Sequence, residues 1–168
     1  MNVEELATVA TLIRSQRVAA LGTLRDNNPF VSMVAYAAEP DFGGLLLHLS
    51  QLAAHTKQLL AAPQSSLLIC EPDDGRDDVQ TLARITLAGA AAPIPAASAA
   101  HAAARACYLA RLPAAVMLFD FPDFALFRFV PSEARYVGGF ARIYTLTPAQ
   151  LRQAAKALAT ESTEHTEK

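Results

Sequence analysis

The sequence predicts a mainly β (α+β) domain, an antiparallel barrel or sandwich with peripheral helices. Apolar runs of strand length recur along the chain, and turns rich in glycine, proline or aspartate separate them. Helical patterns are confined to the two ends, one short crossover and one alanine-rich insertion. Because regular alternation of strand and helix is missing, a doubly wound parallel sheet is disfavoured.

Length and composition predict one domain over residues 1–168, with enough hydrophobic residues (52%) for a sizeable core. Charged residues make up only 18%, so either alanine raises the apolar fraction or an oligomer buries part of the surface. The net charge of −2 argues against a nucleic-acid partner. No apolar run is long enough for a membrane span, and Glu4 and Glu5 do not suit a signal peptide, so we expect a cytoplasmic protein.

The first half of the chain predicts one helix, three strands and a second, short helix. Leu6, Val9 and Leu12 recur at helical spacing, which predicts an amphipathic helix over residues 3–16. The polar segment 25–28 has the composition of a hairpin turn. Strands are expected at 18–24, 30–37 and 45–49, and the short helix at 54–61.

The rest of the chain predicts five more strands and two more helices. The strand at 65–70 is followed by an acidic surface loop at 71–78. Thr147 and Pro148 are typical of a helix N-cap and first helical position, so a helix is expected over about 148–160, before a polar tail at 161–168. The other elements expected are a strand at 82–89, a helix at 96–110, and strands at 124–130, 134–137 and 143–146.

The junction between the strand ending at Ser50 and the following short helix is the strongest candidate for a binding site. Free N–H groups at a helix start and the positive end of the helix dipole favour a phosphate, and Thr56 and Lys57 lie in the first turns. An ordinary surface lysine is the simpler interpretation of Lys57 alone. Arg84, within an apolar strand, needs either a carboxylate partner or an anionic ligand.

Two further features allow a structural and a functional interpretation. The aromatic segment Phe119–Phe124 is typical of a core or subunit interface, and also suits a platform for a planar cofactor. The pair Gly138–Gly139 is either a simple turn or a close approach of backbone to a flat ligand. His48 lies in an apolar strand and suits a core or barrel-rim position. No histidine or cysteine has metal-ligand spacing, so no metal is expected.

Several segments, in order, resemble the pyridoxamine 5'-phosphate oxidase-like FMN-binding split barrels, most closely the haem-utilisation (haem-degrading) branch. They are Ala20–Leu24, Pro29–Ser32, Leu49–Lys57, Ala83–Gly89 and Tyr136–Phe140. The resemblance implies a six-stranded antiparallel split barrel over about 18–146 that forms a homodimer, with FMN at the subunit interface.

The resemblance also implies roles for individual residues. Ser50, Thr56 and Lys57 would hold the FMN phosphate, and His55 would contribute to the same site. Arg84 would contact the phosphate or the ring. The residues near the isoalloxazine ring would be Val31, Ser32 and Met33, and those reaching across the dimer would be Gly139 and Phe140.

The resulting expectation is an FMN-binding flavoprotein, an oxidoreductase of the pyridoxamine-phosphate-oxidase-like group, with no residue assigned as a catalytic acid or base. A haem-binding or haem-degrading protein of the same fold is the first alternative, motivated by His48 and His55. Haem-degrading members of the family carry a further C-terminal domain, and the sequence predicts none here. A non-catalytic flavin-binding module is the second alternative.

Overall fold

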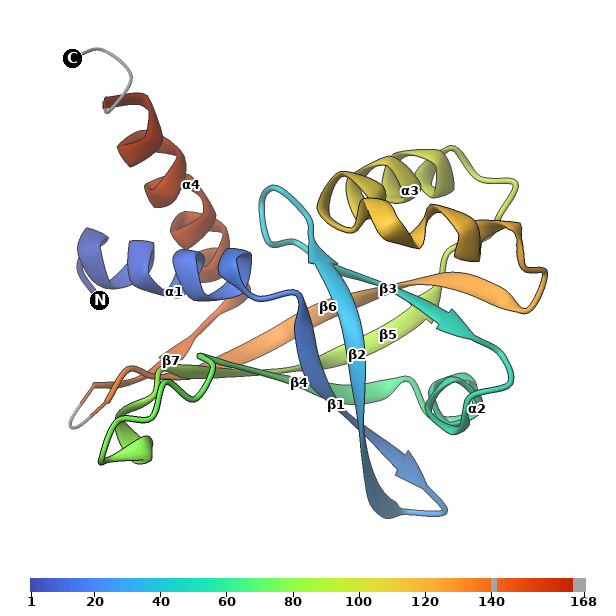
Figure 1. Cartoon of the computed structure of the whole chain (residues 1–168), viewed down its shortest axis with the longest axis horizontal. Helices are drawn as coiled ribbons and strands as arrows, with labels where there is room; N and C mark the ends of the chain where they lie inside the picture. Colours follow the sequence, from blue (N-terminus) through green and yellow to red (C-terminus); the bar gives the residue numbers. More distant parts are fainter. Residues whose placement is uncertain (140–141, 165–168) are drawn as a thin grey trace.

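Six antiparallel strands close into a barrel, and a seventh strand extends the sheet outside it (Figure 1). The structure, a computed structural model, describes residues 1–139 and 142–164, with side chains to residue 157. The strand order is β3-β2-β1-β4-β5-β6-β7, and pairing of β3 with β6 closes the barrel. The mainly β class and the six-stranded split barrel predicted from the sequence are therefore confirmed.

The strands agree with the predicted order and differ mainly at their ends. The short helix α2 (Ala54–Ala61) has the predicted bounds, and Pro63 follows it. The β1–β2 turn is confirmed, with Asp26 and Asn27 both at positive φ, as a tight hairpin requires. The strands are β1 (Val18–Arg25), β2 (Asn28–Ala38), β3 (Leu45–Ser50), β4 (Gln64–Cys70), β5 (Arg84–Pro93), β6 (Phe124–Val137) and β7 (Ile143–Leu146).

Helices cover the two ends of the barrel. At one end, α1 (Val3–Ser15) packs against α4 (Pro148–Glu164), and both bury apolar side chains in the barrel core. Asn2 and Glu5 form a capping box at the start of α1, and the Thr147 hydroxyl accepts from the N–H of Gln150, so the predicted N-cap is confirmed. At the other end, α2 buries Leu59 in the same core (Figure 1).

The prediction of two separate strands at 124–130 and 134–137 is wrong, because β6 runs through Pro131 without a break. Gly89 of β5 pairs with Pro131 and Ala88 with Glu133, which leaves Ser132 as an extra, bulged residue. Phe127 and other odd-numbered residues face the core before the bulge, whereas Ala134 and Tyr136 face it afterwards. This change of phase made one strand look like two in the sequence.

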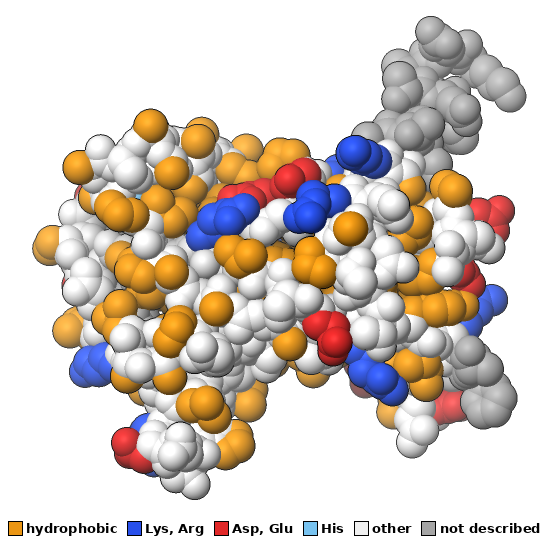
Figure 2. Space-filling view, turned by 180° about the vertical axis from the view of Figure 1, so that it is seen from behind, with side chains coloured by type: hydrophobic (Ala, Val, Ile, Leu, Met, Phe, Trp, Pro, Cys, Tyr) orange, Lys and Arg blue, Asp and Glu red, His pale blue; other side chains and the backbone are white. Residues whose placement is uncertain are grey.

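A separate layer outside the barrel contains the alanine-rich helix α3 (Ala99–Arg111) and the 3-10 segment η2 (Pro113–Asp120). It packs over β3 and β6 through a second apolar cluster that includes Leu46, Tyr108 and Leu126. Figure 2 shows hydrophobic side chains spread over the side of the molecule where this layer lies. Met117 and Phe121 are among the exposed ones. A short 3-10 turn, η1 (Val79–Thr81), precedes β5.

We expect Gly89→Ala to destabilise the protein by about 2–3 kcal/mol, because an added Cβ would create overpacking against β6. That Cβ would lie 2.2 Å from the carbonyl oxygen of Val130 and 3.0 Å from the Cα of Pro131, and both are backbone atoms. Urea unfolding measures the effect. The neighbouring control Ala88→Gly should cost under about 1 kcal/mol, and an equal loss in both variants would contradict the role given to the bulge.

Candidate functional site

The β2–α2 junction brings together two of the residues predicted to form the site. The Ser32 hydroxyl lies 3.1 Å from Nδ1 of His55, although the residues are 23 positions apart in the sequence. Burial lowers the pKa of His55, which favours the neutral imidazole. Within the described residues, Nε2 has no hydrogen-bond partner, so one ring nitrogen is oriented and the other is free to bind a ligand.

The side chain of Ser50 is hydrogen-bonded within the fold, and that of Thr56 is buried. The Ser50 hydroxyl donates to Oδ2 of Asp123 at 2.7 Å and accepts from the N–H of Leu52. Thr56 is fully buried, and its hydroxyl has no hydrogen-bond partner among the described residues. A phosphate beside Ser50 would meet the carboxylate of Asp123, and one beside Thr56 would need α2 to move. The Ser50 hydroxyl is thus engaged and the Thr56 hydroxyl enclosed, and their contact with an FMN phosphate stays a prediction.

Lys57 lies on the exposed side of α2 and lines a hollow of about 290 Å³ together with Arg25. We call this hollow, formed by Leu24, Arg25, Asp26, Ala54, Lys57, Gln58 and Ala61, the Lys57 hollow. It offers two cations and one carboxylate to an anionic group. Sequence analysis missed Arg25 because the residue looked like part of an ordinary hairpin turn.

Arg84 and Gly139 lie away from this junction. The helix α2 leads into the first residue of β4, Gln64. Arg84 of β5 pairs with the last residue of β4, Cys70, so it lies at the opposite end of that strand. Nη1 of Arg84 donates to the carbonyl oxygens of Gln80 and Leu82, and Arg84 and Gly139 line one hollow of about 260 Å³. Within one chain, the predicted residues therefore fall into two groups. Phe140 lies outside the described residues.

Val31 and Met33 point outward from β2 and are largely exposed, by 66% and 70%. They belong to an apolar depression of about 380 Å³ on the outside of the barrel, which we call the outer hollow. Its lining residues are Val18, Ala19, Ala20, Val31, Ser32, Met33, Leu68 and Cys70. Ser32 lies between Val31 and Met33 on β2, so its side chain points to the opposite face of the strand, where its hydroxyl meets His55. Exposed apolar patches of this kind mark ligand or subunit contacts.

His48 is a core histidine, as its apolar surroundings predicted. Its ring stacks on Phe119 at 3.8 Å between centroids and is only 8% exposed. Phe119, from the predicted aromatic segment, therefore serves the packing of η2 on β3. Burial, followed by the charges of His101 and Arg105, lowers the pKa of His48 to about 4. The buried ring is neutral and inaccessible to a ligand.

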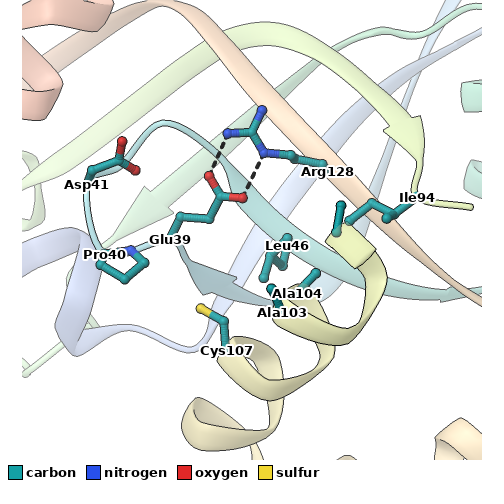
Figure 3. Close-up of a pocket in the computed structure, with 10 residues that line it drawn as sticks. Glu39, Pro40, Asp41, Leu46, Ile94, Ala103, Ala104, Cys107 and Arg128 are labelled. Carbon is teal, nitrogen blue, oxygen red and sulfur yellow. Dashed lines mark hydrogen bonds and ion pairs between the residues drawn. The ribbon is translucent and has the colours of Figure 1, made fainter. Parts of the chain in front are cut away.

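A cavity of about 460 Å³ lies between α3 and the outside of the barrel (Figure 3). Arg128 of β6 forms a bidentate ion pair with Glu39 at 2.6 and 2.7 Å on its wall. Leu46, Ala103 and Cys107 contribute apolar surface. Burial raises the pKa of the Cys107 thiol, so this sulfur is a poor thiolate ligand. No local sequence pattern indicated this cavity, because its lining comes from segments far apart in the chain.

Residues 1–139 and 142–164 contain no group of three metal-ligating side chains arranged to hold an ion. The same part of the chain contains no helix that is long and apolar enough to cross a membrane. Cys70 and Cys107 are both free thiols.

Residues 1–150 match the family described as "CREG, beta-barrel". The non-canonical haem oxygenase HOZ of Arabidopsis thaliana, a chloroplastic protein, is 38% identical over 143 residues, which are 84% of this chain and 42% of that protein. This chain thus spans less than half the length of its plant relative.

Two solved structures illustrate the fold relationship. A haem-binding protein from Mycobacterium smegmatis superimposes with a TM-score of 0.79 and 31% identity, over 90% of this chain and 60% of that one. A general-stress-protein-26-related protein of the pyridoxinephosphate oxidase family from Clostridium acetobutylicum gives a TM-score of 0.69 at 14% identity, over 90% of this chain and 99% of that one. The predicted resemblance to split barrels of this group is confirmed.

His48 makes the stability of the protein depend on pH. Its pKa falls from an ordinary value near 6.5 to about 4 on folding. Between these pH values the unfolded chain is protonated at His48, whereas the folded protein is not. The free energy of unfolding should therefore fall as the pH drops from 6.5 to 4, by up to about 3 kcal/mol from this residue. Denaturant titrations of wild type and His48→Phe measure this loss, which should be smaller in the variant. Parallel curves for wild type and His48→Phe would refute the assignment.

Proposed function

Because the chain belongs to the CREG β-barrel family, and because two of its relatives are a haem oxygenase and a haem-binding protein, we propose that it binds haem. The observation that carries the proposal is the 38% identity to the plant haem oxygenase, which extends over 84% of this chain. Haem thus replaces FMN as the preferred ligand, and the alternative drawn from His48 and His55 becomes the main proposal.

His55 is the residue that would hold the haem iron. A haem-ligating histidine binds iron through one ring nitrogen while a hydrogen-bond partner orients the other. His55 has this arrangement, with Nδ1 beside the Ser32 hydroxyl and Nε2 free. Its lowered pKa keeps the imidazole in the neutral form that binds metal. His48 lies under Phe119, and the Cys107 thiol resists ionisation, so both fit the role less well.

The surroundings of His55 suit a large planar anion. Lys57 lies two residues from His55 on α2, and together with Arg25 it would pair with the carboxylates of haem. Bound haem would supply the redox and oxygen chemistry of its iron. The chain itself would orient the ligand through Ser32 and His55 and exclude water with the apolar residues of β2.

FMN is the second candidate ligand, favoured by the two cations of the Lys57 hollow. The engagement of Ser50 with Asp123 and the burial of Thr56 weaken this candidate. An FMN-dependent oxidoreductase or a non-catalytic flavin module would both need a phosphate held at this hollow. Haem carboxylates and an FMN phosphate are both anions, so Lys57 does not discriminate between the two ligands, whereas His55 does.

We expect haemin titration of the wild-type protein to produce a shifted Soret band, and His55→Ala to abolish it because the residue that would hold the iron is lost. Ser32→Ala should weaken binding by about tenfold or more, since it removes the group that orients the ring. The measurement is absorbance at increasing haemin, with the same series repeated for FMN.

Two variants complete this experiment. Lys57→Ala should weaken haemin or FMN binding alike, and His101→Ala should match the wild type, because His101 lies on α3 away from this junction. Retention of FMN with no response to haemin would reject the haem proposal in favour of the flavin. An unchanged Soret band in His55→Ala would reject His55 as the ligand.

We further propose that the outer hollow lies in a homodimer interface, as the family resemblance predicted. Val18, Val31 and Met33 expose large apolar side chains on adjacent strands of one sheet, which is costly in water. A dimer through this face would also let Arg84 and Gly139 of one subunit approach the β2–α2 junction of the other. The plant relative is chloroplastic, and a cytoplasmic location for this chain stays a prediction.

The dimer predicts that Met33→Glu shifts the protein toward the monomer, because it places a charge within an apolar interface. Size-exclusion chromatography with light scattering measures the mass. Met117→Glu on η2 is the matched control, since Met117 is 67% exposed, close to the 70% of Met33. A monomeric wild type, or equal masses for wild type and Met33→Glu, would contradict this interface.

A further inference from the structure

Two arginines from different helices line one hollow on the side of the barrel where α1, α3 and β2 meet. Arg14 lies near the end of α1, and Arg111 is the last residue of α3. The hollow has a volume of about 340 Å³. Its lining residues, which define the two-arginine hollow, are Ile13, Arg14, Gln16, Tyr36, Ala38, Pro40 and Arg111.

The fold holds the guanidinium of Arg14 in place. Its Nη2 donates to the carbonyl oxygen of Pro40 at 2.8 Å, and its Cζ lies 5.1 Å from the ring centroid of Phe42. A hydrogen bond and a cation–π contact together restrict a side chain that would otherwise move freely. Within the described residues, neither Nε nor Nη1 of Arg14 has a hydrogen-bond acceptor.

Arg111 is held by two hydrogen bonds to the backbone. Its Nη2 donates to the carbonyl oxygens of Ser15 at 2.9 Å and Gln16 at 3.1 Å. These carbonyls lie at the end of α1, where the helix leaves its acceptors unsatisfied. The Nε and Nη1 donors of Arg111 likewise have no acceptor in the described part of the chain.

No carboxylate balances these two charges among residues 1–139 and 142–164. Neither arginine has an acidic oxygen within 4.0 Å there, and no acidic residue lines the hollow. The nearby acids are engaged elsewhere, because Glu39 pairs with Arg128 and Asp41 accepts from the N–H of Gly43. Two ordered guanidinium groups without a counter-charge are an arrangement that suits an oxyanion.

We propose that the two-arginine hollow binds a small organic oxyanion, a carboxylate or a phosphate ester, bridged by Arg14 and Arg111. The planar donors of a guanidinium match the oxygens of either group. Ile13, Ala38 and Pro40 form apolar walls for a compact hydrocarbon or aromatic body. The hollow shares no lining residue with the outer hollow or the Lys57 hollow, so this ligand is distinct from haem or flavin.

A purely structural role for the arginines makes a different prediction. Arg111 completes the end of α1, and a cation there also interacts favourably with the helix dipole. That role alone would lower stability on substitution and leave the protein indifferent to added anions. Anion binding, in contrast, requires the unused donors of both residues, which a stability measurement does not report.

The test uses inorganic phosphate and benzoate as probes for the whole protein in low-chloride buffer. Isothermal titration calorimetry measures binding, and NMR of the arginine Nε–H signals identifies which side chains respond. We expect millimolar or tighter binding of at least one probe, with shifted signals from Arg14 and Arg111. Arg14→Gln and Arg111→Gln should each weaken binding by about tenfold or more, since each removes charged hydrogen bonds.

Two further variants guard against an indirect effect. Arg111→Lys keeps the charge and its contact with the end of α1 while removing the planar fork, so it should fold and still bind more weakly. Arg152→Gln, an exposed arginine of α4, should match the wild type. Phosphate binding alone would identify a phosphate ester, and benzoate binding alone a carboxylate. Arginine signals that move with neither probe, or equal weakening in Arg152→Gln, would overturn the proposal.

Discussion

Pairing between β3 and β6 is the constraint on which the rest of this structure depends. It runs from Leu45 opposite Phe129 to Ser50 opposite Phe124, and it turns a sheet with two edges into a closed barrel. Closure gives the core its inward-facing residues from all six strands, and it fixes where β3 ends. The Ser50–Asp123 hydrogen bond lies at that end, so the start of α2 and the position of His55 both depend on this closure.

The same closure separates the molecule into two environments with different chemistry. Inside lies an apolar core, whose few buried polar groups are at the α2 end, where Thr23 donates to Gln58. Outside, the barrel wall carries three kinds of surface: the apolar outer hollow, the layer of α3 and η2, and the basic hollow beside α1. Because successive side chains of a strand point to opposite faces of the sheet, each strand contributes residues both to the core and to the outer surface.

Most helices and strands could be predicted from the sequence, because their ends are determined by residues that are close together in the chain. The polar turn at 25–28, the proline after α2 and the Thr147 cap all act within a few positions. The continuity of β6 was missed because the bulge at Ser132 reverses the phase of burial, and η2 was missed because its apolar residues resemble a strand or core segment.

The candidate site was predicted only in part, for a related reason. Residues near one another in sequence, such as His55 and Lys57, could be assigned to one junction. The contact of Ser32 with His55 and the shared hollow of Arg25 and Lys57 depend on β2 and α2 meeting in space, which no local pattern encodes. Arg84 belongs to the same ordered set of family motifs as these residues. In the fold, however, it lies on β5 and pairs with Cys70, at the end of β4 that is far from α2.

The alanine-rich face of α3 makes only weak contact with the barrel at the start of the helix. Ala100, Ala103 and Ala104 border the large cavity without filling it, whereas Tyr108 is buried near the other end of the helix. An alanine contact contributes much less burial free energy than a leucine or tyrosine contact. Detaching the first turns of α3 from the barrel therefore requires less free energy than separating any pair of barrel strands, and amide protons there should exchange with solvent while the barrel stays closed.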